Sequence, residues 1–536
     1  MILLLFSILP TLLWDEGPAT APQLEKAGIH EIAVTRDPGS WAPTGMSATQ
    51  VDVARLIRFD TIGVDYQVGV AGATAAPWVE SNLWRMIRDP KSSFLYDVPP
   101  ASLPLALAEA YAGGAKTYLR VKPENLGDFA AAYRFLAQLH GPPLRPRVNF
   151  ALVDDRSPEM DEIMNLLVRR NLLFTASDTA HKAAAPQVRI GAPGYPKKSA
   201  ADPDLFAAMV RSRIDDAKRL VRVYGSETVL VRLYGDEWHA RLHLLQYGRG
   251  AATGVRIRVL GEYPRVYLSG FKRTCSHVTD IVVEKSATEF SIPELGPFAV
   301  VDLEGLEPAV LHSARARADQ SLTADPTSDF WAAAPPVHTT RDVFGAPAGL
   351  GDTEVRSRWT PESIYLLFIC PFERLNLKPG PVTDRETPSL WQWDVAEAFI
   401  GVIGAGGVRY REFEISPQAE WLDLDINCGE GDLEHHADWN SGVQVRARID
   451  YDRRIWYGAM RIPTAALGAL AARAGDRLPI GLFRTAGQAP GTKLVSWQPT
   501  YRRSFHVPEA FGGLLFDPVR TNYCRLALNG CHACVT

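Results

Sequence analysis

Short apolar runs alternate with longer amphipathic stretches in the first part of the chain. Residues 94–98, 117–121 and 148–153 are apolar runs that predict buried strands. Residues 126–139 carry apolar side chains at three- and four-residue spacing and predict a helix, and a further helix is expected from Pro203 to about Val223. This alternation is typical of an α/β layer built on a mostly parallel sheet.

The pattern changes near residue 226 to short strands separated by Gly, Pro and Ser. In one of these strands Val255, Ile257 and Val259 alternate with Arg256 and Arg258, so that one face is buried and the other solvated. This region predicts a small antiparallel β-sandwich. A longer series of short strands begins at Phe330 and predicts a second, larger β-sandwich.

The predicted fold class is therefore multidomain α/β plus all-β: an α/β layer, a small antiparallel β-sandwich and a larger C-terminal β-sandwich. A length of 536 residues agrees with several domains, because single cores stop growing at about 250–300 residues. The predicted boundaries are 25–225 for the α/β domain, 226–306 for the small sandwich, 307–329 for a linker, 330–516 for the larger sandwich and 517–536 for a tail.

The N-terminal segment is almost unbroken apolar sequence from Met1 to Trp14, and Ala19-Thr20-Ala21 resembles a signal-peptidase site. Residues 1–24 are therefore predicted to be a signal peptide, which implies a secreted, periplasmic or extracellular protein. No Lys or Arg precedes the apolar run, so the alternative is a buried first strand or helix. No later segment has about 18 uninterrupted apolar residues, which excludes a polytopic membrane protein.

Charge and cysteine content exclude further classes. The net charge is −4, and the 57 Lys and Arg residues are scattered among 61 acidic ones, whereas nucleic-acid binding needs a basic stripe. The six cysteines are too dispersed for a disulfide-built scaffold. Cys531 and Cys534 have C-x-x-C spacing without a second ligand pair, so a disulfide or free thiols are expected there rather than zinc.

The segment from Leu390 to Phe399 has the side chains that sugar sites use. Trp391 precedes an apolar strand with Asp394 and Glu397 at its head. Sugar rings pack their C–H groups on indole faces, and their hydroxyls need fixed polar partners. Trp391 and Glu397 are six residues apart, so on a strand they would share one face. The alternative for Trp391 is packing in the core.

This segment resembles family 9 carbohydrate-binding modules, and further marks of the family follow in order over roughly residues 330–516. They are the Trp391-x-x-Asp394-x-x-Glu397 run, Tyr410-x-x-Phe413-Glu414-Ile415-Ser416-Pro417, Trp456 with Met460-Arg461-Ile462-Pro463, Ser496-Trp497, and Phe505-His506-x-Pro508-x-x-Phe511-Gly512.

The resemblance implies a β-sandwich with bound calcium, in which two aromatic rings clamp a terminal sugar with the help of a carboxylate. Trp391 would be one jaw, Phe505 would stand at the second jaw, and Glu397 would accept hydroxyl hydrogens, with Asp394 beside them. Better-studied members carry tryptophan where this chain has Phe505, and a phenyl ring offers less stacking area.

A calcium loop is imitated by Asp423-x-Asp425-x-Asn427 with Glu434 further on. Glycine falls one place late, at Gly429, so the alternative is a strand with alternating solvated acids. The sequence His435-His436 with Asp438 is a second metal candidate, whose alternative is an exposed loop.

The main catalytic candidates are Asp154 and Asp155, at the C-terminal end of a predicted parallel strand, where α/β proteins place ligand sites. Other candidates are Asp65, Asp97 and the pair Asp236-Glu237, which equally suits a hairpin turn. Glycoside hydrolysis normally needs two such carboxylates. Asp155 equally suits a helix cap before Ser157-Pro158. The order of domains also resembles the accessory portion of β-galactosidase-like glycosidases, although about 170 residues are too few for a barrel of about 250.

The sequence thus predicts a secreted protein that binds an oligo- or polysaccharide in carbohydrate breakdown, with calcium as a structural cofactor. The alternatives are a glycoside hydrolase with an appended sugar-binding module and a structural or adhesive surface protein.

Overall fold

A computed structural model describes residues 8–68, 75–178, 186–272, 276–284, 286–402, 409–427, 433–468 and 472–518. The chain divides near residue 307 into two compact units, and each is described by itself. Among the described residues, no helix is both long and apolar enough to cross a membrane.

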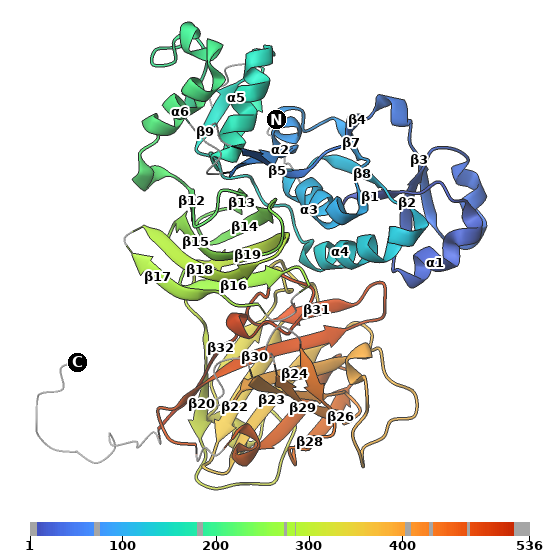
Figure 1. Ribbon diagram of the computed structural model, residues 1–536. Coiled ribbons are helices and arrows are strands. Elements are labelled where there is room, and N and C mark those ends of the chain that lie inside the picture. The colour runs from blue at the N-terminus through green and yellow to red at the C-terminus, as the bar shows by residue number, and fades with distance from the viewer. Residues whose placement is uncertain are drawn as a thin grey trace, which may run out of the picture. The chain divides into compact units, whose positions relative to one another are not determined.

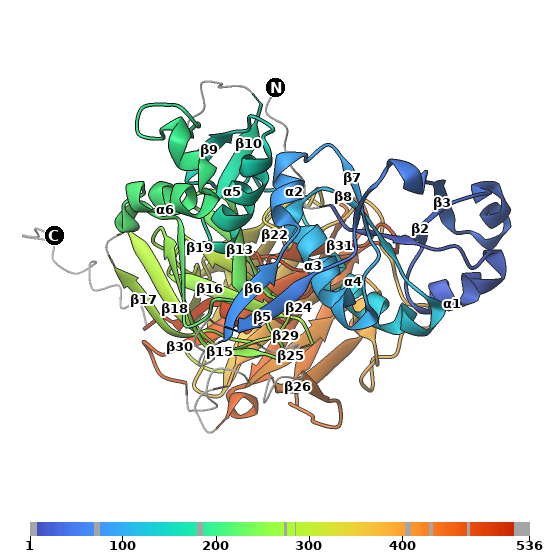
Figure 2. The same ribbon diagram turned by 45° about the horizontal axis from the view of Figure 1, so that its top comes forward.

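The first unit is built on a six-stranded parallel sheet (Figure 1). Its strands, in spatial order, are β3 (Ser47–Gln50), β2 (Glu31–Val34), β1 (Thr11–Leu13), β8 (Lys116–Arg120), β7 (Ser93–Tyr96) and β4 (Ile57–Phe59). The helices of this layer are α1 (Ala21–Lys26), α2 (Leu83–Arg88), α3 (Leu103–Gly113) and α4 (Leu126–Leu139), and β5 (Gly63–Val68) and β6 (Ala75–Glu80) form a separate antiparallel ribbon (Figure 2).

Strand β1 favours the alternative interpretation of the N-terminal segment. It lies between β2 and β8 and pairs in parallel with both. Leu12, Leu13 and Trp14 are buried, and the indole N–H of Trp14 donates a hydrogen bond to Thr20 Oγ1 at 2.8 Å. The alternative interpretation of the apolar run, a buried first strand, is therefore what the structure has at residues 11–13.

A second, three-stranded parallel sheet follows, with the order β10 (Phe174–Ser177), β9 (Phe150–Val153) and β11 (Gln187–Val188). It is accompanied by α5 (Pro158–Arg169) and α6 (Pro203–Arg213). The prediction of one helix from Pro203 to about Val223 is wrong, because α6 ends at Arg213 and Val221–Tyr224 forms strand β12. Val221 pairs with Val259, a partner that lies far away in the sequence.

The small sandwich consists of two four-stranded antiparallel sheets around one apolar core. One sheet has the order β12, β15 (Ala252–Leu260), β18 (Ala287–Leu295) and β17 (Thr279–Glu284), and the other β13 (Val229–Gly235), β14 (His239–Gln246), β19 (Phe298–Glu304) and β16 (Arg265–Gly270). Val255, Ile257 and Val259 are buried, as their alternation with arginine predicts.

The second unit is one large sheet that folds over on itself into a sandwich. Its main path is β27 (Glu434–His436), β26 (Trp421–Asn427), β25 (Arg409–Ile415), β24 (Val395–Gly401), β30 (Arg477–Ala486), β32 (Gly512–Phe516), β20 (Val310–Arg315), β22 (Thr353–Trp359), β23 (Ser363–Pro371), β29 (Ile455–Pro463) and β28 (Gln444–Asp450). Strands β21 (Pro336–Thr339) and β31 (Lys493–Ser496) pair with β22 and β30, and α7 spans Asp329–Ala332.

The core of this sandwich joins the two halves of the sheet. Ala398 and Phe413, from β24 and β25, lie in one cluster of buried side chains with Leu366 and Trp456, from β23 and β29. A smaller apolar cluster covers the other face of β24 and β25 and includes Phe399. This second face is where the candidate site lies.

The predicted fold class is confirmed, since a parallel α/β layer, a small antiparallel sandwich and a larger β-sandwich are all present. The linker expected at 307–329 is in part wrong, because Val310–Arg315 forms β20 and pairs in parallel with β22 and β32. Of the six cysteines, Cys370 alone lies in the described part of the chain, where burial raises the pKa of its thiol to about 12. The predictions for the tail cysteines and for Gly429 fall outside the described residues.

Candidate functional site: a cavity beside Trp391

Trp391 lies on a short 3₁₀-helical turn, Leu390–Gln392, directly before strand β24. Leu390 is fully buried and holds the turn against the sandwich, whereas the Trp391 side chain is 45% exposed. The core-packing alternative for Trp391 is thus contradicted. Trp391 and Glu397 do not share a strand face as the spacing predicts, because the tryptophan precedes the strand; they nevertheless line one cavity.

Asp394 follows this turn and is not among the residues that line the cavity. Its side chain is buried, and Oδ1 accepts a hydrogen bond of 2.7 Å from the backbone N–H of Gly487. The Asn376 side-chain amide donates to the carbonyl oxygens of Gln392 and Gly487 at 3.2 and 3.1 Å. Burial raises the pKa of Asp394. Contact of Asp394 with a sugar stays a prediction; Oδ1 is engaged by Gly487, whereas Oδ2 has no hydrogen-bond partner among the described residues.

The cavity has a volume of about 290 Å³ and is bounded by aromatic rings and polar groups. Trp391, Glu397, Glu412, His506 and Phe505 are among its walls. The hydroxyl of Thr485 donates a hydrogen bond of 3.0 Å to Glu397 Oε1 and so fixes that carboxyl group. The first and second aromatic residues of the predicted clamp are thus in the same cavity.

Phe505 is a wall of the cavity and not a freestanding jaw. Its ring stacks on Phe483, with centroids 4.4 Å apart and planes 15° from parallel. Little of the ring remains exposed. Because one face is occupied by Phe483, only the remaining surface of Phe505 is available to a ligand, which agrees with a smaller stacking contribution than tryptophan would give.

Three glutamates meet on the cavity side of β24 and β25. Glu397 lies directly opposite Glu414 in the antiparallel register, and Glu412 is two residues before Glu414 on the same face. Burial raises the pKa of Glu397 and of Glu414 well above its ordinary value and that of Glu412 to about 7, and mutual repulsion of the carboxylates adds to the rise for Glu397 and Glu414.

Two histidines complete the polar lining. Nδ1 of His506 and the Tyr410 hydroxyl form a hydrogen bond of 2.7 Å. Burial lowers the pKa of His506 to about 3. The rings of His435 and His506 are 5.3 Å apart, and burial also lowers the pKa of His435. Both imidazoles are therefore neutral at physiological pH.

The predicted calcium loop is not supported by its contacts. Asp425 forms ion pairs with Arg409 and Arg411, and Asp423 accepts a hydrogen bond of 3.0 Å from the Ser441 backbone N–H. Both aspartates are buried, which contradicts the alternative of solvated acids, whereas calcium binding by this loop stays a prediction. Asn427 donates to Glu434 at 3.3 Å, and His436 lies 3.7 Å from Glu434.

Asp423 and Asp425 lie on the face of β26 opposite to the cavity, so they do not form one site with the cavity residues. Asp423 pairs with Phe413, whose side chain is in the sandwich core, whereas Leu424 pairs with Glu412 on the cavity face. Within the described parts of the chain, the one group of three metal-ligating side chains close enough to hold an ion is Glu397, Glu412 and Glu414.

The predicted catalytic pair is occupied by structural contacts. Asp154 is buried and binds the Arg88 guanidinium through both oxygens, at 2.8 and 3.0 Å, and Arg156 contacts it as well. Asp155 accepts hydrogen bonds from the backbone N–H and the hydroxyl of Ser157, the residue that caps α5. Neither residue lines the cavity beside Trp391. The helix-capping interpretation of Asp155 is the one that these contacts favour.

These contacts predict that Asp154 and Asp155 contribute differently to the stability of the first unit. We expect Asp154→Asn to destabilise the first unit by about 2 kcal/mol, because it removes the buried carboxylate that pairs with both Arg88 and Arg156 and leaves Arg88 with Asp161 alone. We expect Asp155→Asn, at an exposed position, to change stability by less than about 1 kcal/mol. Urea unfolding of the two purified variants measures the difference; equal stability would contradict the structural role of Asp154.

Glu412 and Glu414 were not identified as site residues from the sequence. Acids at alternate positions of a strand are typical of a solvated face, and nothing within β25 itself distinguishes a solvated face from a buried acidic cluster. The signal that could have identified them lies in two strands together. Tyr410, Glu412 and Glu414 occupy alternate positions of β25, and the pairing of β25 with β24 places them beside Glu397.

No family model matches this sequence, and no curated protein matches it. Solved structures that are similar to parts of the chain include a family 9 carbohydrate-binding module from Caldicellulosiruptor kristjanssonii in complex with cellotriose, at 11% identity and TM-score 0.27 over 41% of this chain and 100% of that one. Alpha-L-fucosidase isoenzyme 2 from Paenibacillus thiaminolyticus is similar at 10% identity and TM-score 0.34 over 42% of this chain and 63% of that one.

A rhamnosidase from Novosphingobium sp. PP1Y is similar at 10% identity and TM-score 0.28, over 89% of this chain and 54% of that one. At such identities and TM-scores these likenesses carry no argument about function. The function is therefore argued from the cavity itself.

Proposed function

We propose that the cavity beside Trp391 binds a terminal unit of an oligo- or polysaccharide. The observation that carries this proposal is an indole that is 45% exposed and lines the same cavity as two carboxyl groups, Glu397 and Glu412. An exposed indole offers a flat apolar face for the C–H groups of a sugar ring. Carboxyl oxygens accept hydrogen bonds from the sugar hydroxyls, which lose water on binding.

The dimensions of the cavity favour one sugar ring over a long bound chain. Its volume of about 290 Å³ is at the lower end of ligand pockets, which span about 300–1,000 Å³. In this proposal Trp391 stacks on the ring, Glu397 accepts a hydroxyl hydrogen, and Phe505 closes one side. Because burial raises the pKa of Glu412 to about 7, its carboxyl group can donate a hydrogen bond below that pH and accept one above it.

The proposal extends to a role in polysaccharide breakdown outside the cell. Glycoside hydrolysis by Asp154 and Asp155 is not part of it, because Arg88 and Ser157 already bind these carboxylates.

Calorimetric titration of the full chain with a panel of neutral and acidic mono- and oligosaccharides, cellotriose included, tests the binding function. We expect at least one saccharide to bind and Trp391→Ala to weaken it about tenfold or more, since loss of a stacking face removes roughly 1–2 kcal/mol. The chain should still fold, because Trp391 is 45% exposed and lies outside the buried core clusters.

Trp238→Ala is the matched control. Trp238 is also an exposed tryptophan, at 57%, but it belongs to the first unit and not to the cavity. Its replacement should leave saccharide affinity unchanged. Absence of heat with every saccharide, or equal affinity of Trp391→Ala and the unaltered chain, would overturn the proposed function.

A further inference from the structure

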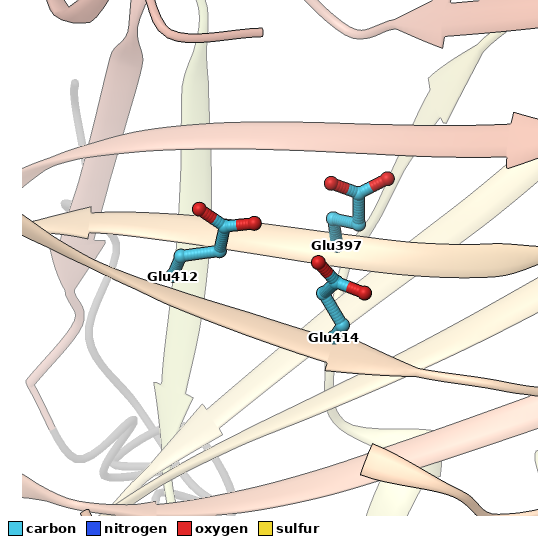
Figure 3. A group of neighbouring side chains, drawn as sticks. All are labelled: Glu397, Glu412 and Glu414. Carbon is cyan, nitrogen blue, oxygen red and sulfur yellow. The ribbon is translucent and has the colours of Figure 1, made fainter. Parts of the chain in front are cut away.

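The three glutamates beside the cavity are almost completely buried, whereas glutamate side chains in folded proteins are ordinarily exposed unless they are paired. Glu397, Glu412 and Glu414 are 2%, 3% and 1% exposed. One carboxylate oxygen from each lies within 4.8 Å of the other two, and Figure 3 shows the three carboxyl groups close together on β24 and β25. Like charges in such positions on neighbouring strands destabilise a sheet unless something compensates them.

Glu414 provides the second observation. Both of its carboxylate oxygens are buried, and among the described residues neither meets a hydrogen-bond donor outside the cluster. Oε2 of Glu412 is likewise buried and has no hydrogen-bond donor among the described residues. Buried polar atoms in folded proteins nearly always have partners, and an unpartnered atom in a native structure indicates an ion, a water or a functional role.

The cluster has no cationic partner among the residues that the structure describes. Within the described parts of the chain, no lysine, arginine or histidine nitrogen lies within 4.0 Å of a carboxylate oxygen of these three residues, although Arg409 and Arg411 form such pairs with Asp425 nearby. The Thr485 hydroxyl, which donates to Glu397, is neutral. Removing a carboxylate from water without a partner costs several kcal/mol, so a compensating cation or proton is required.

The cluster is accessible to a small ion. Glu397 and Glu412 line the cavity beside Trp391, and Glu414, directly across from Glu397 in the register, lies behind them. An ion entering through the cavity would meet two carboxylates first and the unpartnered carboxylate last. Coordination positions on the cavity side would remain for water or for oxygen atoms of a ligand.

The donor set decides the class of ion. Three carboxylates are hard oxygen ligands, which suit Ca²⁺, Mg²⁺ or Mn²⁺ rather than the softer metals that sulfur and imidazole select. The histidines of the cavity are not close enough to join the group, and His506 is engaged by Tyr410 through Nδ1.

We propose that Glu397, Glu412 and Glu414 bind one divalent cation of the oxygen-preferring class, with Ca²⁺ as its representative, at the inner end of the cavity. This site differs from the loop of Asp423, Asp425, Asn427 and Glu434 that the sequence predicts. It shares Glu397 and Glu412 with the proposed saccharide site but does not require saccharide binding, because the carboxylates alone supply the ligands.

The test is calorimetric titration of the full chain, freed of metal with a chelator, with CaCl₂ and separately with MnCl₂ in the absence of saccharide. We expect one ion per chain with a Kd below about 10⁻⁴ M for at least one of the two metals. Glu414→Gln should weaken binding at least tenfold, because the amide keeps the shape and removes the charge. Glu412→Gln should do the same and serves as the second variant.

Glu434→Gln is the control, because it neutralises an exposed acid of the predicted loop that lies outside the cluster. Its affinity for the ion should match that of the unaltered chain. Each variant's melting temperature in chelator reports on folding; the charge-removing variants should melt no lower than the unaltered chain without metal.

Failure of both metals to bind up to about 1 mM would overturn the proposal and assign the compensation to protons. Unchanged affinity in both Glu414→Gln and Glu412→Gln would overturn it too. Because saccharide is absent from the titration, neither result bears on the saccharide site, which the Trp391→Ala comparison tests separately.

Discussion

Replacing Glu109 with leucine is expected to destabilise the first unit by about 4 kcal/mol or more. Glu109 is a fully buried side chain on α3, and its Oε1 accepts hydrogen bonds from the Ser81 hydroxyl at 2.7 Å and the Asn82 backbone N–H at 2.8 Å. The hydroxyls of Tyr96 and Tyr247 also donate to its two oxygens. Leucine would leave these buried donors unsatisfied, at about 1–3 kcal/mol for each.

The position of this network makes the expected loss large. Tyr96 lies on β7 of the parallel sheet, Ser81 follows the β5–β6 ribbon, and Tyr247 directly follows β14 of the small sandwich. One carboxylate therefore connects three parts of the first unit. Burial raises the pKa of both tyrosines well above the ordinary value, so they remain donors at every pH at which the protein is handled.

Urea unfolding followed by tryptophan fluorescence measures this loss, and hydrogen exchange of the β7 amides assigns it to the first unit. Glu25→Leu is the matched control, because Glu25 is exposed on α1. Its effect should stay within about 0.5 kcal/mol. A Glu109→Leu protein as stable as this control would show that the hydroxyls find other partners.

Local sequence patterns predict the elements whose signal lies within the element itself. The spacing of apolar residues over 126–139 gives both ends of α4, since Leu126, Phe129, Leu136 and Leu139 form one buried face. The strands from Thr353 to Pro371 follow in the same way from β-branched and aromatic runs bounded by turns.

Elements that depend on a distant partner were misread. Residues 214–223 continue a polar and apolar mixture that is compatible with a helix, and only the pairing of Val221 with Val259 makes a strand there favourable. Strand β20 is similar, because Val310–Arg315 pairs with β22 and with β32, which lies about 200 residues later in the chain. Strand propensity reflects cross-strand neighbours more than the strand's own residues.

The dependence on distant partner strands also limited the prediction of the site. The motif singled out Trp391 and Glu397, because a tryptophan beside strand acids is itself informative, but it did not predict that Glu397 is buried. Glu412 and Glu414 become site residues only through the register of β25 against β24. Asp423 and Asp425 looked like ligands because of their spacing, but Arg409 and Arg411, two residues apart on the next strand, already neutralise Asp425.

Deleting residues 1–21 is expected to prevent the first unit from folding while the second unit keeps its structure. The deletion removes β1, which lies between β2 and β8 and pairs with both, so two neighbouring strands lose their backbone partners. It also removes the buried side chains of Leu12, Leu13 and Trp14. Burial of each contributes about 1.5–3 kcal/mol, which together approaches the whole stability of a domain, about 5–15 kcal/mol.

Hydrogen exchange of the two units in the deleted chain measures the effect, with amides of β2 and β8 expected to lose protection and those of β24 and β30 to keep it. Trp14→Ala isolates one contribution and should cost about 3–5 kcal/mol, whereas Glu16→Ala, at an exposed neighbouring position, should cost less than about 0.5 kcal/mol. Native protection of β2 and β8 in the deleted chain would show that the sheet closes without β1. The apolar segment could then serve as a signal peptide, and its place in the sheet would not be needed for folding.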